Sequence, residues 1–149
     1  YVGRVAVEKN IKAFLDLDLE GTKLIIGKGP DLDNLKKKFT NDIFLGERTN
    51  GELASHFASS DVFVFPSKTD TFGIVVLESL ACGTPVAAYP VPGPKDILGG
   101  TKIDTLDEDL KASALKALKV SRQDCLEFSK KYSWEETARI FFDNISPNN

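Results

Sequence analysis

The sequence contains no methionine, only two cysteines and one histidine, and no large excess of either charge. Cys82 and Cys125 are too few for a disulfide scaffold, so we expect a reduced, cytoplasmic interior. No apolar run approaches the ~20 residues that cross a bilayer. Lys and Arg number 19 against 22 Asp and Glu, for a net charge of -3. This balance excludes a nucleic-acid binder that depends on a basic face.

The absence of methionine also means that the chain carries no initiator residue, and it opens at Tyr1-Val2-Gly3 within a predicted strand. We therefore expect an internal or C-terminal piece of a longer protein. A length of 149 residues suits one domain, since domains usually span ~100–200 residues. With 42% hydrophobic and 28% charged residues, the composition is that of an ordinary globular protein and excludes wholesale disorder.

Short apolar runs alternate with helical patterns over residues 1–89. Strands are predicted at 1–3, 23–27, 43–46, 62–66 and 85–89, and helices at 8–19, 32–39, 52–59 and 73–81. The run VFVFP at 62–66 is continuously apolar, which is typical of a strand covered on both faces. The alternation predicts an α/β fold: a Rossmann-like parallel sheet with right-handed crossovers and helices on both faces.

The pattern changes after Tyr89. A proline-rich loop is predicted at 90–94, a short helical turn at 95–98 and a last edge strand at Ile103. Three C-terminal helices follow, at 107–119, 122–131 and 134–145. Ser133 and Glu136 form a capping box for the last of them.

Parallel sheets bind ligands outside the carboxyl ends of their strands, so the loops at those ends are the candidate site. Gly3, Arg4 and Lys9 follow the first strand, and residues 66–73 follow the fourth and lead into a helix. Gly73 allows backbone N–H groups to approach a ligand closely, and a helix N-terminus favours an anion. Two cations beside such a terminus suit a diphosphate without a metal.

Two carboxylates extend this candidate site. Glu78 lies inside the helix that starts near Gly73, where it can accept two hydrogen bonds from a ribose diol. Asp70, in the preceding loop, can hold hydroxyls of a second sugar. The loops together predict a sugar nucleotide as the ligand. The alternative is structural: Glu78 pairs inside the domain, because an unpaired buried carboxylate is costly, and Asp70 caps the helix.

Several segments resemble a known family. Residues 3–10, GRVAVEKN, are similar to the segment that opens the nucleotide-binding domain of family 4 glycosyltransferases with the GT-B fold. Residues 70–78, DTFGIVVLE, resemble their signature of two acidic residues separated by seven others. Residues 65–67, 78–86 and 132–135 also fit, in order and at family spacing.

The resemblance implies that residues 1–149 are the C-terminal, donor-binding domain of a two-domain enzyme whose N-terminal acceptor domain is absent here. Such an enzyme moves a sugar from a nucleotide diphosphate to an acceptor hydroxyl, with retention and without a metal or other cofactor. UDP- and GDP-sugars are the expected donors. We also expect that the full-length enzyme can contact a membrane peripherally. The lysines at 36–38 could form such a contact, although a solvated helix face also explains them.

The resemblance also implies roles for single residues. Arg4 and Lys9 would bind the donor diphosphate, Glu78 the ribose and Asp70 the donor sugar. Family members more often carry Glu at the position of Asp70, which leaves the identity of the sugar open. The implied donor-binding residues are Gly3, Arg4, Lys9, Asp70, Thr71, Phe72, Gly73, Ile74 and Glu78, with catalytic roles for Arg4, Lys9, Asp70 and Glu78.

Two other functions fit the same fold. A sugar-nucleotide 2-epimerase would need acid–base residues that these loops do not obviously supply. A catalytically silent module that binds a sugar nucleotide within a larger assembly would need no further residues.

Overall fold

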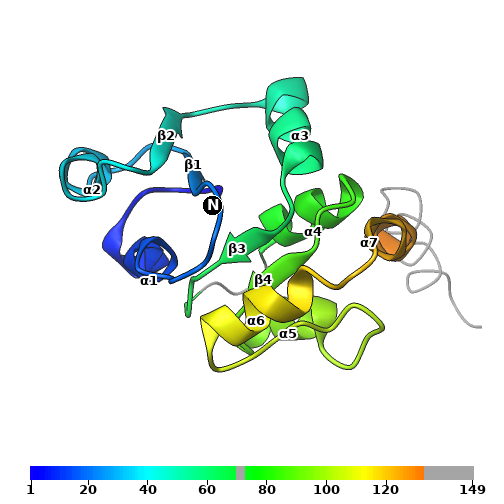
Figure 1. Cartoon of the computed structure of the whole chain (residues 1–149). Helices are drawn as coiled ribbons and strands as arrows, with labels where there is room; N and C mark the ends of the chain where they lie inside the picture. The colour runs from blue at the N-terminus through cyan, green and yellow to red at the C-terminus, as the bar shows by residue number, and fades with distance from the viewer. Residues whose placement is uncertain (70–72, 133–149) are drawn as a thin grey trace, which may run out of the picture.

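The computed structural model describes residues 1–69 and 73–132, in which short parallel strands alternate with helices (Figure 1). The strands are β1 (Leu24–Ile26), β2 (Ile43–Gly46), β3 (Phe63–Phe65) and β4 (Val86–Ala88). The helices are α1 (Ile11–Leu15), α2 (Leu32–Lys38), α3 (Asn50–Ser59), α4 (Ile74–Ala81), α5 (Pro92–Leu98), α6 (Leu110–Ala117) and α7 (Arg122–Ser129), with 3-10 turns η1 (Val7–Lys9) and η2 (Lys130–Tyr132). The predicted helix at 134–145 and its capping box lie outside the described residues.

The strands form two parallel pairs. β1 pairs with β2, with a register shift between Ile25 and Ile26, and β3 pairs with β4 in regular register. The segment Tyr1–Val5 runs parallel to β1 on the other side from β2: Ile26 N donates to Tyr1 O (2.8 Å) and Gly3 N donates to Ile26 O (3.0 Å). The predicted first strand therefore exists as a backbone pairing that carries one regular bridge, Val2 to Ile26.

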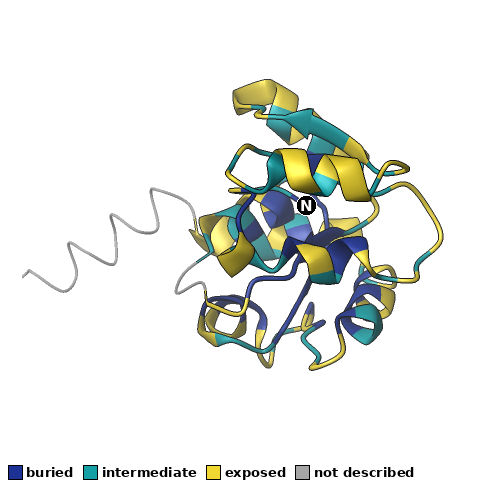
Figure 2. Ribbon diagram, turned by 90° about the vertical axis from the view of Figure 1, so that its left-hand side faces the viewer, coloured by how far each residue is buried: buried dark blue, intermediate teal, exposed yellow. Residues whose placement is uncertain are grey.

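Helices cover both faces of the β3–β4 pair, because alternate strand residues point to opposite sides. In β3, Phe63 and Phe65 pack into one hydrophobic core, and Val64 packs into the other. The core around Val64 includes buried residues of α1 and α6, and the core around the two phenylalanines includes buried residues of α3, α4, α5 and α7. Figure 2 shows the buried residues in the middle of the molecule and the exposed ones on the outer helix faces. The predicted α/β, Rossmann-like fold with helices on both faces is confirmed.

Two predicted elements after β4 were wrong. The proline-rich segment is not a loop: α5 begins at Pro92 and contains Gly93 and Pro94 in its first turn, where proline loses no helical hydrogen bond. Ile103 lies in a turn rather than in an edge strand, although it is buried at 3% exposure. Its apolar character reflects packing against the α4–α7 side of the sheet, not strand pairing.

The predicted helix at 8–19 is also divided. Asn10 adopts a left-handed conformation (φ 52°, ψ 33°) that ends η1 and precedes α1. Asparagine tolerates this conformation better than most residues. None of the helices in the described ranges is long and apolar enough to cross a membrane.

Candidate functional site

A cleft of about 580 Å³ lies at the carboxyl ends of the strands, between the N-terminal segment and the start of α4. This volume is within the ~300–1,000 Å³ typical of small-molecule sites. Its walls come from the segment beside β1 and η1, from the end of β3, and from the first residues of α4. The lining residues are Tyr1, Val2, Gly3, Arg4, Glu8, Lys9, Phe65, Ser67, Gly73, Ile74 and Val75.

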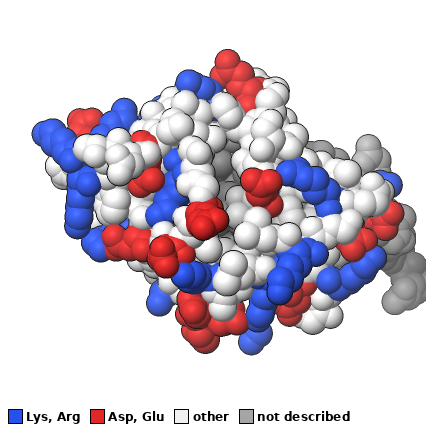
Figure 3. All heavy atoms as spheres, viewed as in Figure 1, with Lys and Arg blue, Asp and Glu red and all other residues white. Residues whose placement is uncertain are grey.

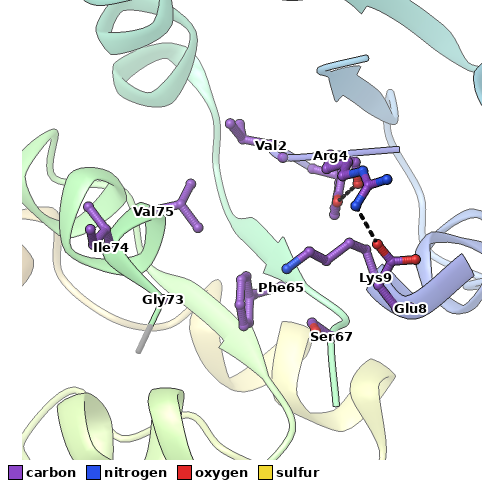
Figure 4. Close-up of a pocket in the computed structure, with 11 residues that line it drawn as sticks. Val2, Arg4, Glu8, Lys9, Phe65, Ser67, Gly73, Ile74 and Val75 are labelled. Atoms are coloured by element: carbon purple, nitrogen blue, oxygen red, sulfur yellow. Dashed lines mark hydrogen bonds and ion pairs between the residues drawn. The ribbon is translucent and has the colours of Figure 1, made fainter. Parts of the chain in front are cut away.

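The N-terminal wall supplies the cations. Arg4 is 65% exposed at its side chain, and its Nη1 lies 3.2 Å from Glu8 Oε1. Figure 4 shows the Arg4 guanidinium turned toward Glu8, and Lys9 extended across the cleft toward Phe65. An exposed ion pair of this kind contributes ~0–1 kcal/mol. The ion pair with Glu8 therefore stabilises this position of Arg4 only weakly, and an anion in the cleft can replace Glu8 as the partner of Arg4.

Two glycines allow the N-terminal wall to pack closely against the turn after β1. A Cβ on Gly27 would lie 1.8 Å from Gly3 O, and a Cβ on Gly29 would lie 2.1 Å from Val5 O. Val5 N donates to Lys28 O (2.9 Å) at the same place. The turn at 27–30 thus positions the backbone that carries Gly3 and Arg4.

The opposite wall is the N-terminus of α4. Gly73, with φ 74° and ψ 54°, precedes the first helical residue, and this left-handed conformation favours glycine. Ile74 is 64% exposed although it is a large apolar residue. Val76 N donates to Gly73 O (2.8 Å), whereas the N–H groups of Ile74 and Val75 come before the regular helical hydrogen bonds, so they are the ones available to a ligand.

Of the predicted site residues, Gly3, Arg4, Lys9, Gly73 and Ile74 line this one cleft. Asp70, Thr71 and Phe72 lie outside the described residues. Glu78 does not line the cleft and is exposed, so the structural alternative, in which Glu78 is a buried carboxylate paired inside the domain, does not describe this structure. Its position four residues after Ile74 places it on the same helix face, one turn and ~6 Å further along α4.

Glu78 nevertheless acts on a neighbour. Burial raises the pKa of the Cys82 thiol, and the Glu78 carboxylate adds to the rise. Cys82 follows Glu78 by one helical turn, on the side away from the cleft mouth. The carboxylate therefore lies between the cleft and the C-terminus of α4.

Ser67 is a lining residue that the sequence argument did not assign to the site. It is 1% exposed and lies two residues after the end of β3. Its place at the carboxyl end of a strand was the available signal, but a serine there is too common to be singled out.

Other features that could bind a ligand or a membrane lie away from this cleft. Lys36, Lys37 and Lys38 are exposed along α2. Figure 3 shows that both signs of charge are interspersed over the face in view. A second hollow of about 760 Å³ lies beside α5 and is lined by none of the predicted site residues. Within residues 1–69 and 73–132, no group of three His, Cys, Asp or Glu side chains could hold a metal ion.

Comparison with known proteins identifies the family. Residues 1–131 match the family model described as "Glycosyl transferases group 1". The chain belongs to this glycosyltransferase family. It is 41% identical over 103 residues to the sulfoquinovosyl transferase SQD2 of Arabidopsis thaliana, a match that covers 66% of this chain and 20% of that protein. It is 33% identical over 132 residues to a GDP-mannose-dependent alpha-mannosyltransferase of Corynebacterium glutamicum, covering 82% of this chain and 32% of that protein.

Solved structures agree on the fold. An S. aureus TarM mutant in complex with fondaparinux, alpha-GlcNAc-glycerol and UDP matches 99% of this chain and 35% of its own, with a TM-score of 0.77 and 19% identity. The catalytic domain of the Helicobacter pylori cholesterol-alpha-glucosyltransferase matches 93% of this chain and 96% of its own, with a TM-score of 0.63 and 19% identity. The group 1 domain thus has the GT-B type of Rossmann-like fold, and it spans a third or less of the two curated relatives named above.

Proposed function

We propose that this chain is the C-terminal, donor-binding domain of a family 4 glycosyltransferase and that the cleft holds the diphosphate of a UDP- or GDP-sugar. The observation that carries the proposal is the meeting of two cationic residues and a helix N-terminus in one cleft at the carboxyl ends of the strands. The relatives support this class of ligand: one acts on GDP-mannose, and one solved neighbour was crystallised with UDP.

The diphosphate is the part of the ligand that this geometry suits best. Lys9 extends into the cleft and Arg4 lies at its edge, where phosphate oxygens can replace Glu8 as its partner. Gly73, Ile74 and Val75, at the N-terminus of α4, line the same space. As the glycosidic bond breaks, negative charge grows on the departing diphosphate, and these fixed donors stabilise it.

The ribose and the donor sugar are bonded to opposite ends of the diphosphate, so they would lie on either side of the phosphate position. Glu78 accepts hydrogen bonds from the ribose diol, one turn along α4 from the cleft residues. By resemblance, Asp70 and the backbone of Thr71 and Phe72 contact the donor sugar.

The finer features of the reaction are also proposals. The transfer retains the anomeric configuration and needs no metal, because cations of the chain neutralise the phosphates. An N-terminal domain of the same protein carries the acceptor. The enzyme acts in the cytoplasm, with peripheral membrane contact through its full-length form.

Removal of the Arg4 guanidinium tests the proposal. Arg4→Ala should lower the affinity for UDP or GDP by about tenfold or more, because a hydrogen bond to a charged group contributes ~1.5–3 kcal/mol. Uridine or guanosine should bind almost as before, since they have no phosphate. Calorimetric titration with and without a chelator measures all of these affinities.

Lys102→Ala is the matched control, because Lys102 is an exposed cation that pairs with Asp124 away from the cleft. It should leave nucleotide affinity unchanged. Loss of nucleotide binding in chelator would show that a metal, not Arg4 and Lys9, neutralises the phosphates. Binding without sugar transfer by the full-length protein would favour the silent module, and interconversion of sugar nucleotides would favour the 2-epimerase.

A further inference from the structure

Ser67 has a buried hydroxyl group that faces the cleft. The residue is 1% exposed and belongs to the lining. Figure 4 shows it on the segment that follows β3, on the same side of the cleft as Lys9. It is therefore a polar group that bulk water barely reaches but that a bound ligand can contact.

The segment around Ser67 is tied in place by η1 and the residue after it. Asn10 Nδ2 donates to Pro66 O (3.0 Å), and Thr69 Oγ1 donates to Glu8 O at 3.4 Å. The two hydrogen bonds lie on either side of Ser67. They connect it to the turn that carries Lys9, so the serine and the lysine are positioned together.

The hydrogen bonding of Ser67 is incomplete. Its Oγ accepts one long hydrogen bond, from Thr69 N at 3.4 Å, and its O–H has no acceptor among residues 1–69 and 73–132. Native proteins rarely leave a buried donor unsatisfied. Other buried hydroxyls here do donate to backbone carbonyls, namely Ser79 to Thr84, Thr84 to Phe57, Thr105 to Val86 and Ser113 to Ala88.

The acceptor for Ser67 is expected to be an anionic oxygen. Arg4 and Lys9 line the same cleft, and the positive end of α4 faces it. Such surroundings favour phosphate oxygens, which accept short and strong hydrogen bonds from hydroxyl groups. We propose that Ser67 is a further donor-binding residue, whose O–H donates to a phosphate oxygen of the nucleoside diphosphate; this inference rests on the proposed function.

Calorimetric titration of the chain with UDP, GDP and their nucleosides tests the proposal. Ser67→Ala should weaken binding of the preferred diphosphate about tenfold or more and leave nucleoside binding unchanged. The melting temperature should stay the same or rise, because the variant removes an unsatisfied donor. Ser67→Cys, which keeps the size but donates weakly, should bind with intermediate affinity.

Ser79→Ala is the matched control, since Ser79 is equally buried but donates to Thr84 O at 2.9 Å. It should lower the melting temperature and leave diphosphate affinity unchanged. Unchanged diphosphate affinity in Ser67→Ala, or an equal loss for the nucleoside, overturns the proposal while the proposed function stands. Weaker binding of a sugar nucleotide alone overturns it too, because the hydroxyl then contacts the sugar. Failure of the unmodified chain to bind either diphosphate overturns the proposed function, and this inference with it.

Discussion

Among the predicted site residues that the structure describes, Glu78 stands apart because it does not line the cleft. Its carboxylate takes part in no hydrogen bond or ion pair within the described ranges. It lies on the helix face that continues from Ile74, one turn beyond the cleft. An exposed carboxylate on an otherwise apolar helix is therefore available to a ligand that extends from the cleft along α4.

Replacement of Glu78 by glutamine separates the ligand role from a structural one. Glu78→Gln should weaken binding of UDP or GDP about ten- to a hundredfold, because two hydrogen bonds to a charged acceptor become one to a neutral acceptor. The loss should be much smaller for the 2′,3′-dideoxy analogue, which has no diol. Titration of both nucleotides measures the difference, and Glu127→Gln, on α7, is the control.

The melting temperature decides between the two roles. Glu78→Gln should melt as the unmodified chain does, because the side chain is exposed. A large fall in melting temperature with unchanged nucleotide affinity would instead identify Glu78 as a structural carboxylate.

At the scale of single residues, the sequence predicted that Arg4, Lys9 and Gly73 lie close together, but it did not predict how far each site residue is buried. Strand order places Arg4, Lys9 and Gly73 at one sheet edge, and they line one cleft. The burial of Ser67 and the exposure of Glu78 depend on the rotation of a loop and a helix against their neighbours. Residue spacing does not determine that rotation.

Among the elements, the turn between β1 and α2 supports the N-terminal wall of the cleft. The turn at 27–30 has the sequence GKGP, whose glycines and proline are typical of a turn. The reason that both glycines are required lies in Gly3 and Val5, whose carbonyls occupy the space of a Cβ. These contacts join segments far apart in the sequence, so local patterns could not reveal them.

Gly29→Ala should destabilise the chain by ~1–3 kcal/mol or more, the usual effect of overpacking a close contact. Its Cβ would lie 2.1 Å from Val5 O, and that carbonyl is fixed as the acceptor of Asp31 N at 3.2 Å. Nucleotide affinity should fall as well, because the displaced segment carries Arg4. Urea unfolding and UDP titration measure the two effects.

Gly51→Ala provides the opposite outcome for the same chemical change. Gly51 lies in α3, and a Cβ there would meet nothing within 4 Å. Alanine at such a site should stabilise the helix by ~0.5–1 kcal/mol. Equal effects of the two substitutions would contradict the close approach at Gly29.

Element boundaries were predictable where the chain is regular. β2 has the predicted bounds, Ile43–Gly46, and the predicted strand at 62–66 contains β3. α5 was missed because proline usually marks a loop, yet the first turn of a helix tolerates it. The strand at Ile103 was wrong because burial alone does not distinguish a strand from a packed turn.

At the scale of the whole molecule, α7 closes one face of the sheet by packing on α4, the helix whose N-terminus forms a wall of the cleft. Cys125 lies in this contact at 0% exposure. Burial raises the pKa of its thiol to about 11, and the Asp124 carboxylate acts in the same direction. The fold thus favours the protonated thiol over the thiolate.

This preference predicts how stability depends on pH. In the unfolded chain the Cys125 thiol has a pKa of ~8.5, and in the folded chain its pKa is about 11. The stability that the protonated thiol contributes is therefore fully present below pH ~8.5 and is lost as the pH rises toward about 11. A rise from ~8.5 to about 11 corresponds to a loss on the order of 3 kcal/mol. Cys125→Ala lacks the thiol, so its free energy of unfolding should not contain this decline, whereas other titrating groups affect both chains equally.

Urea unfolding of both chains at several pH values between 8 and 11 measures the effect. The stability of the unmodified chain relative to Cys125→Ala should fall steadily over this range. Parallel curves would show that water reaches the thiolate in the folded state. Because Cys125 is fully buried, a thiol reagent should reach it only when α7 separates from α4 or the domain unfolds. A bound nucleotide that stabilises α4 should then slow the reaction of Cys125, which connects the packing of this face to occupancy of the cleft.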